Sequence, residues 1–110
     1  MRIIRTRTFD RRAKRVSLTE DEIEALTKAL IERPEVGDVI RGSGGARKVR
    51  VRLAGRGKSG GARVIYAVVL RSTALVLLDV YAKSSQANLT VDELKAIAKL
   101  IREIETRWPP

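Results

Sequence analysis

The chain has 110 residues and a net charge of +10, and 44% of its residues are hydrophobic. That length suits a single domain over residues 1–110, and the hydrophobic fraction argues against a disordered chain. Cysteine is absent, which excludes a disulfide framework, and histidine is absent, which removes the commonest zinc ligand and the commonest acid–base group. We therefore expect no metal site and no cofactor.

The charge and the apolar segments predict a compartment and a type of partner. A sequence pI of about 10.9 favours an acidic partner, with nucleic acid as the first candidate. The start, MRIIRTRTFD, lacks the apolar run of a signal peptide. No segment approaches the roughly 20 apolar residues of a membrane span. We expect a soluble cytoplasmic protein with no membrane partner.

The first two predicted elements are short. The segment RIIRTRT at residues 2–8 alternates weakly in polarity and fits an edge strand. The basic segment 9–16 fits a short helix, whose inward-facing positions would be Phe9, Ala13 and Val16.

A capping box marks the next helix. Thr19 precedes Glu22 by three residues, and acidic side chains crowd the first turn, where the helix dipole favours them. The apolar stripe consists of Ile23, Leu26 and Leu30. The proline and the glycine of PEVGDV end this helix, and a short strand is expected at residues 39–40.

Three strands are predicted in succession. The first, residues 47–53, alternates cation and aliphatic, so that Lys48, Arg50 and Arg52 share one face. The second, residues 62–70, has Arg63 near its start. The third, residues 75–82, is almost continuously aliphatic, as expected of a central strand that is buried on both faces.

The last predicted helix begins at another capping box, formed by Thr90 and Glu93. Its apolar positions recur at steps of three and four; they are Leu94, Ile97, Ile101, Ile104 and Trp108. The order of elements predicts an α+β domain in which the helices pack on one face of a small, mostly antiparallel sheet.

The predicted sheet region carries positive charge that no acid offsets. Between Asp38 and Asp79 there are nine Lys or Arg residues and no Asp or Glu. Like charges across a sheet are destabilising, so their clustering is easier to understand if an anion occupies the site. The loop GRGKSGG fails the P-loop pattern and fits a hairpin connection with two further cations, Arg56 and Lys58.

Three other side chains of this region have two open interpretations each. Asp79 is the one acid of the predicted strands, and either a buried hydrogen-bonding role or a role in a site would fit it. Tyr66 and Tyr81 lie in strands, where a core position is the more usual one.

Three stretches resemble one family when they occur in this order. They are GSGGARKVR, GKSGGARVIY and YAKSSQANLT, and they resemble the RelE/HigB superfamily of bacterial toxins from type II toxin–antitoxin systems, in particular its HigB-like branch. The resemblance implies a RelE-like fold, cleavage of messenger RNA on the ribosome, translation inhibition, and neutralisation by an antitoxin, here HigA-like.

The resemblance also implies site residues. The family's lysine-rich strand corresponds to Lys48 and Arg50, its arginine before the second motif to Arg63, and its later lysine to Lys83. The chain departs from the RelE branch at Ser84, where that branch has an arginine, so the resemblance assigns no general acid.

Cleavage without histidine can use the 2′-hydroxyl of the RNA as the nucleophile. Arginine pairs well with phosphate oxygens, which suits Arg50 and Arg63, and a lysine among cations can accept a proton, which suits Lys48. Lys83 and Tyr81 are candidates for the leaving 5′-oxygen or for positioning. The predicted RNA- and ribosome-binding residues are Arg47, Arg52, Arg56 and Lys58.

Two other functions fit the same charge. The chain could be a non-catalytic nucleic-acid- or ribosome-binding protein, because net charge supports binding without cleavage. It could also be a ParE-like toxin directed at DNA gyrase, although the basic strand and Arg63 favour the ribonuclease.

Overall fold

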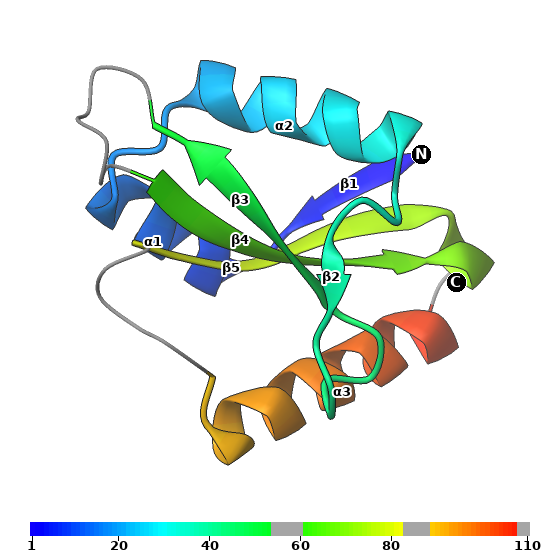
Figure 1. Ribbon diagram of the computed structural model, residues 1–110. Coiled ribbons are helices and arrows are strands. Elements are labelled where there is room, and N and C mark those ends of the chain that lie inside the picture. Colours follow the sequence, from blue (N-terminus) through cyan, green and yellow to red (C-terminus); the bar gives the residue numbers. More distant parts are fainter. Residues whose placement is uncertain (54–60, 83–88, 108–110) are drawn as a thin grey trace.

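The fold is that of a computed structural model, which describes residues 1–53, 61–82 and 89–107 (Figure 1). Its elements in chain order are β1 (Arg2–Arg5), α1 (Arg7–Arg15), α2 (Glu20–Glu32), β2 (Asp38–Val39), β3 (Arg47–Arg52), β4 (Gly61–Val69), the 3-10 turn η1 (Leu70–Ser72), β5 (Ala74–Ala82) and α3 (Val91–Arg107). Where the structure describes the chain, the predicted elements are confirmed, with boundaries that shift by a few residues at most. Trp108, the last predicted apolar position of the final helix, lies outside the described residues.

The strands form one five-stranded sheet in the order β1-β5-β4-β3-β2. Only β1 pairs in parallel, with β5, and the other three described pairings are antiparallel. The prediction of an α+β fold with a mostly antiparallel sheet is therefore confirmed. Strand β5 lies between β1 and β4, and its residues from Ala74 to Tyr81 are all buried, as its continuous apolar sequence predicted.

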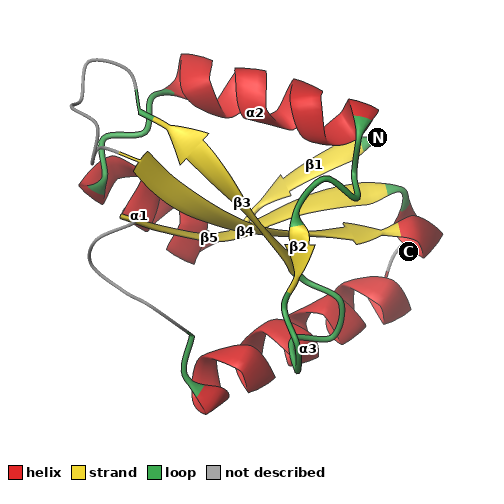
Figure 2. Cartoon of the chain, in the orientation of Figure 1, coloured by secondary structure: helices red, strands yellow, loops and turns green. Residues whose placement is uncertain are grey.

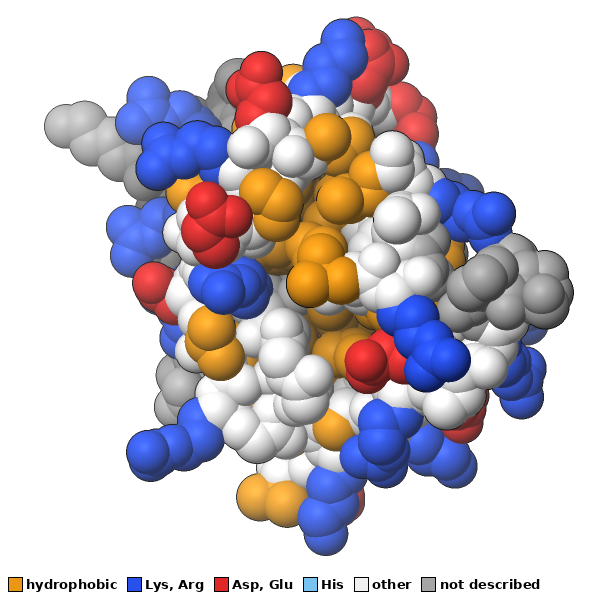
Figure 3. Space-filling view, turned by 90° about the vertical axis from the view of Figure 1, so that its right-hand side faces the viewer, with side chains coloured by type: hydrophobic (Ala, Val, Ile, Leu, Met, Phe, Trp, Pro, Cys, Tyr) orange, Lys and Arg blue, Asp and Glu red, His pale blue; other side chains and the backbone are white. Residues whose placement is uncertain are grey.

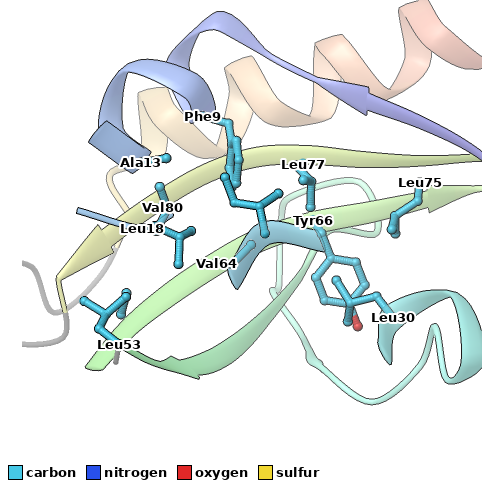
Figure 4. Packing of buried hydrophobic residues seen from close by; sticks show 12 residues of the cluster. Phe9, Ala13, Leu18, Leu30, Leu53, Val64, Tyr66, Leu75, Leu77 and Val80 are labelled. Carbon is cyan, nitrogen blue, oxygen red and sulfur yellow. The ribbon is translucent and has the colours of Figure 1, made fainter. Parts of the chain in front are cut away.

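Helices α1 and α2 cover one face of the sheet. Phe9 and Ala13 of α1 and Leu30 of α2 pack in one cluster with alternate residues of β4 and β5, among them Val64 and Leu77 (Figure 4). Thr6 caps α1, because its hydroxyl accepts a hydrogen bond from the Phe9 N–H at 3.0 Å.

Helix α3 covers the opposite face (Figure 2). Its residues Ile97, Ile101 and Ile104 pack against the other alternate positions of the same strands, such as Ile65 and Val76. The prediction that all helices pack on one face was wrong in this respect. Because β4 and β5 are apolar on both faces, a single helical layer would leave one of those faces in water.

Both predicted capping boxes are present. The Glu22 N–H donates to the Thr19 hydroxyl at 3.1 Å and the Thr19 N–H donates to the Glu22 carboxylate at 2.8 Å. Thr90 and Glu93 make the same reciprocal pair, with donor–acceptor distances of 2.8 and 3.1 Å. These side chains satisfy N–H groups that the first helical turn leaves free, which fixes where α2 and α3 begin.

Candidate functional site

The cations of β3 lie on the α3 side of the sheet, beyond the apolar part that α3 covers. Val49 pairs with Val64, which belongs to the α1–α2 cluster, while Lys48 pairs with Ile65, which belongs to the α3 cluster. Because side chains alternate along a strand, Lys48, Arg50 and Arg52 all point to the α3 side. The predicted cation face is confirmed.

A shallow pocket of about 280 Å³ opens at this basic face. Its lining residues are Asp38, Lys48, Val49, Arg50 and Arg63. Arg50 and Arg63 are direct partners in the register of β3 and β4, so two guanidinium groups occupy adjacent positions on one face. Within the part of the chain that the structure describes, none of these three cations forms an ion pair. With three cations against the single carboxylate of Asp38, the pocket presents a net positive charge, which suits an anion.

The side chain of Arg63 has a buried donor without an acceptor. Its Nε atom is shielded from solvent and has no hydrogen-bond partner among the described atoms. A buried unsatisfied donor costs free energy, roughly 1–3 kcal/mol, and more for a charged group. An anion bound in the pocket would offset the repulsion between Arg50 and Arg63.

The segment that precedes β2 is fastened to the sheet beside this pocket. The buried hydroxyl of Tyr66 accepts a hydrogen bond from the Gly37 N–H at 2.9 Å and donates one to the Pro34 carbonyl at 2.7 Å. The Arg47 guanidinium donates to the carbonyls of Glu35 and Gly37, at 3.1 and 2.7 Å. Burial raises the pKa of Tyr66, which keeps this hydroxyl protonated and able to donate.

The close approach at this segment requires a glycine. A Cβ atom on Gly37 would lie 2.8 Å from the Lys48 carbonyl oxygen and 2.8 Å from the Tyr66 ring. With glycine there, β2 pairs with β3 so that Asp38 lies opposite Lys48. The sequence interpretation missed Asp38 as a site residue, because the contacts that place it join residues about thirty positions apart, such as Gly37 and Tyr66.

Asp79 has a structural partner. Its carboxylate accepts a hydrogen bond from the Val80 N–H at 2.7 Å and pairs with the Arg12 guanidinium of α1 at 3.1 Å. Burial raises the pKa of Asp79, and the Val80 N–H and Arg12 partly offset this effect. Of the two interpretations of Asp79, the structure supports the buried hydrogen-bonding one.

The remaining predicted site residues have different placements. Tyr81 is the register partner of Arg63 but is only 6% exposed, and it packs in the α3 cluster. Arg52 is exposed at the end of β3. Arg47 holds the backbone before β2, so a direct role in RNA binding stays a prediction for it. Lys83, Arg56 and Lys58 lie outside the described residues.

Two further properties concern the described residues as a whole. No helix among them is both long and apolar enough to span a bilayer. They also contain no group of three or more acidic side chains placed to hold a metal ion.

Comparison with known proteins gives the family. The family model described as "RelE toxin of RelE / RelB toxin-antitoxin system" matches residues 1–107. A free-state structure of the E. coli toxin RelE, carrying two arginine-to-alanine substitutions, is similar in fold, with a TM-score of 0.55 and 19% sequence identity. The similarity covers 90% of this chain and 94% of that one. With the basic pocket in place on this fold, the chain belongs to the RelE toxin family and is a toxin of a toxin–antitoxin system, acting as a ribosome-dependent endoribonuclease.

Proposed function

We propose that this toxin cleaves messenger RNA without a metal ion, by attack of the 2′-hydroxyl of the RNA on the adjacent phosphate. The observation that carries the proposal is the pair Arg50 and Arg63, adjacent in register, with a buried Arg63 donor that has no partner among the described atoms. Two guanidinium groups can hold the non-bridging phosphate oxygens and stabilise the charge that builds on them in the transition state.

The proton of the nucleophile needs an acceptor, and Lys48 lines the same pocket. In this proposal the Lys48 side chain accepts the proton of the 2′-hydroxyl while the bond from O2′ to phosphorus forms. The bond from phosphorus to the 5′-oxygen then breaks, and that oxygen gains a proton to leave as a 5′-hydroxyl. We propose Tyr81 and Lys83 for protonating or positioning this leaving oxygen.

The other predicted cations would hold the polyanion on either side of the cut. Arg52 continues the basic row of β3, and Arg47 lies at the opposite end of that strand. Arg56 and Lys58 precede β4 in the sequence. Each cation that neutralises a phosphate releases a counterion, so RNA binding should weaken steeply as salt rises.

The ends of the cut RNA test the chemistry directly. Internal 2′-hydroxyl attack leaves a 2′,3′-cyclic phosphate and a 5′-hydroxyl, so end-group analysis of messenger cut on translating ribosomes should find both. A 5′-phosphate with a 3′-hydroxyl would rule out this attack, and with it the roles of Lys48, Arg50 and Arg63. The end groups are a better measurement than chelation, because ribosomes themselves need magnesium.

The family implies an antitoxin, and we propose that this antitoxin is HigA-like, acidic or amphipathic, and that both proteins act in the cytoplasm. Figure 3 shows hydrophobic side chains gathered in a strip down one face, flanked by Lys and Arg side chains and by several Asp and Glu side chains. An amphipathic segment with acidic residues at its margins would complement both kinds of surface.

A further inference from the structure

Helix α1 carries its positive charge on the side that faces away from the sheet. Phe9 and Ala13 turn inward and are buried in the cluster that includes residues of β5 (Figure 4). The opposite side has cations at steps of three and four residues, which place them on one face of the helix. This α1 basic surface consists of four exposed residues: Arg7, Arg11, Lys14 and Arg15.

Acidic side chains around α1 pair with other arginines. Asp10 and Glu20 both pair with Arg5 of β1, and Asp79 of β5 pairs with Arg12. Among the residues that the structure describes, no member of the α1 basic surface forms a salt bridge. The fold therefore pairs the arginine on the inner side of α1 and leaves the outward cations without a carboxylate.

This arrangement lowers the stability of the helix. Arg7 lies four residues before Arg11, and like charges at that spacing repel each other. Arg7 is also in the first turn, where the helix dipole disfavours a cation. Lys14 and Arg15 are in the last turn, where the dipole favours cations. Helix stability therefore accounts for the last two cations but not for Arg7 and Arg11, which an external anion would explain.

The composition of the surface indicates which polyanion it fits. Protein interfaces have an apolar or aromatic core, which the four cations do not supply. Single-stranded nucleic acid is held by bases that stack on aromatic rings, but Phe9, the one aromatic residue of α1, is buried. Double-stranded RNA is recognised mostly through its shape and its backbone. The α1 basic surface therefore fits the phosphates of an RNA duplex best.

The α1 basic surface and the basic pocket lie on opposite faces of the sheet. Helix α1 packs on the face that α2 also covers, whereas Lys48 and Arg50 point to the α3 side. Strand β5, on which α1 packs, is next to β4, which carries Arg63. An RNA strand in the pocket therefore leaves α1 able to contact a second segment of RNA.

We propose that the α1 basic surface binds a double-stranded segment of ribosomal RNA while the pocket holds the messenger. Arg7 and Arg11 contact phosphates, and Lys14 and Arg15 extend the contact to about 12 Å along the helix axis. Contacts of this kind position a protein without reading the sequence, so the surface orients the toxin on the ribosome. This inference uses the ribosome dependence of the family and does not rest on the proposed 2′-hydroxyl attack.

Binding to a synthetic RNA duplex tests the inference. Fluorescence anisotropy would compare the wild type with the double variant Arg7→Gln, Arg11→Gln on a blunt-ended duplex of about 20 base pairs and on a single strand of equal length. The duplex affinity of the variant should fall about tenfold, and the dependence of log affinity on log salt should become shallower by about two, one for each lost phosphate contact. The affinity for the single strand should change by about threefold or less, because the pocket cations are intact.

Two further double variants serve as controls. Lys28→Gln with Arg33→Gln removes the same charge from the end of the otherwise acidic helix α2, and the duplex affinity should stay within about twofold of the wild type. Arg7→Lys with Arg11→Lys keeps the charge and should keep most of the affinity. Glutamine has nearly the helix propensity of arginine, so the melting temperature of the test variant should hold.

A second measurement uses the ribosome itself. The double variant Arg7→Gln, Arg11→Gln should need about tenfold more translating ribosomes for half-maximal cleavage. An unchanged ribosome requirement, an unchanged duplex affinity, or an equal loss in the α2 control would overturn the inference. An equal loss for the single strand would overturn the duplex preference, and a loss of antitoxin affinity alone would assign the surface to a protein partner. A wild-type toxin that cuts nothing would contradict the proposed function, while the duplex measurement would still decide this inference.

Discussion

Arg63 should be required for activity and dispensable for folding. Its charge faces Arg50, and its buried Nε lacks a partner among the described atoms. Arg63→Ala removes both unfavourable terms, so the melting temperature should hold or rise slightly. Loss of one preorganised phosphate donor should lower the cleavage rate by about 10²- to 10³-fold, which would abolish growth arrest on induced expression.

The matched control is Arg71→Ala, since Arg71 is an exposed arginine in η1, beyond the far end of β4. This variant loses the same charge and should stay toxic. An Arg63→Ala protein that remains fully toxic, or one that unfolds, would show that Arg63 is not the phosphate anchor.

Replacing Lys48 by another cation should preserve RNA binding but not catalysis. Lys48→Arg retains the positive charge in the pocket, so the affinity for RNA should be kept. A guanidinium stays protonated and cannot accept the 2′-hydroxyl proton, so the rate should fall by at least about 10²-fold. Equal single-turnover rates for the two proteins would assign the proton to another acceptor.

At the scale of elements, the hydrogen bonds of the Tyr66 hydroxyl should stabilise both the fold and the segment beside the pocket. Tyr66→Phe leaves the Gly37 N–H and the Pro34 carbonyl without their partner, which should lower the free energy of unfolding by about 1–2 kcal/mol. Urea unfolding would measure the loss, and amide exchange at Gly37 should become faster. Thr106→Val provides a control, because it removes an exposed hydroxyl that bonds the Glu103 carbonyl within α3 and should cost less. An unchanged exchange rate at Gly37 would mean that the segment before β2 keeps its position without the Tyr66 hydroxyl.

The contribution of Asp79, which pairs with Arg12 of α1, to the stability of the fold should depend on pH. Burial raises the pKa of Asp79, so the folded state binds this proton more tightly than the unfolded chain does. The stabilisation that this bound proton gives to the fold is full below the unfolded pKa of about 4. It declines as pH rises through the folded pKa. Relative to the wild type, Asp79→Asn should gain stability between about pH 4 and neutrality, as urea unfolding across that range would measure. A relative loss would show that attraction to Arg12 outweighs burial.

The helices and strands, and the face on which each side chain lies, could be predicted from the sequence because they depend on local periodicity. Alternation along β3 placed Lys48 and Arg50 on one face, and the capping pairs placed the starts of α2 and α3. The side on which α3 packs was mispredicted, since an amphipathic helix fits either face of a sheet that is apolar on both. Asp38 was missed because a two-residue strand has no period of its own, and contacts from Tyr66 and Arg47 decide its register.

At the scale of the whole molecule, the net charge of +10 should make the free toxin bind RNA of any sequence. A cognate antitoxin that covers part of the basic surface should suppress this binding. Size-exclusion chromatography with the product of the adjacent gene should give a stable complex at micromolar concentration and modest salt. If no complex forms over that range of salt, the proposed antitoxin partner would be wrong.

The strand order determines how late in its synthesis the toxin can fold. Strand β1 pairs with β5, so that Arg2 lies beside Ala74, and α1 packs on β5 as well. During synthesis β1 and α1 leave the ribosome first, but the strand on which they pack, β5, is made much later. Contacts so distant along the sequence also form slowly. The ribosome that makes this toxin has therefore translated most of it before the sheet can close, and the topology itself delays activity relative to translation.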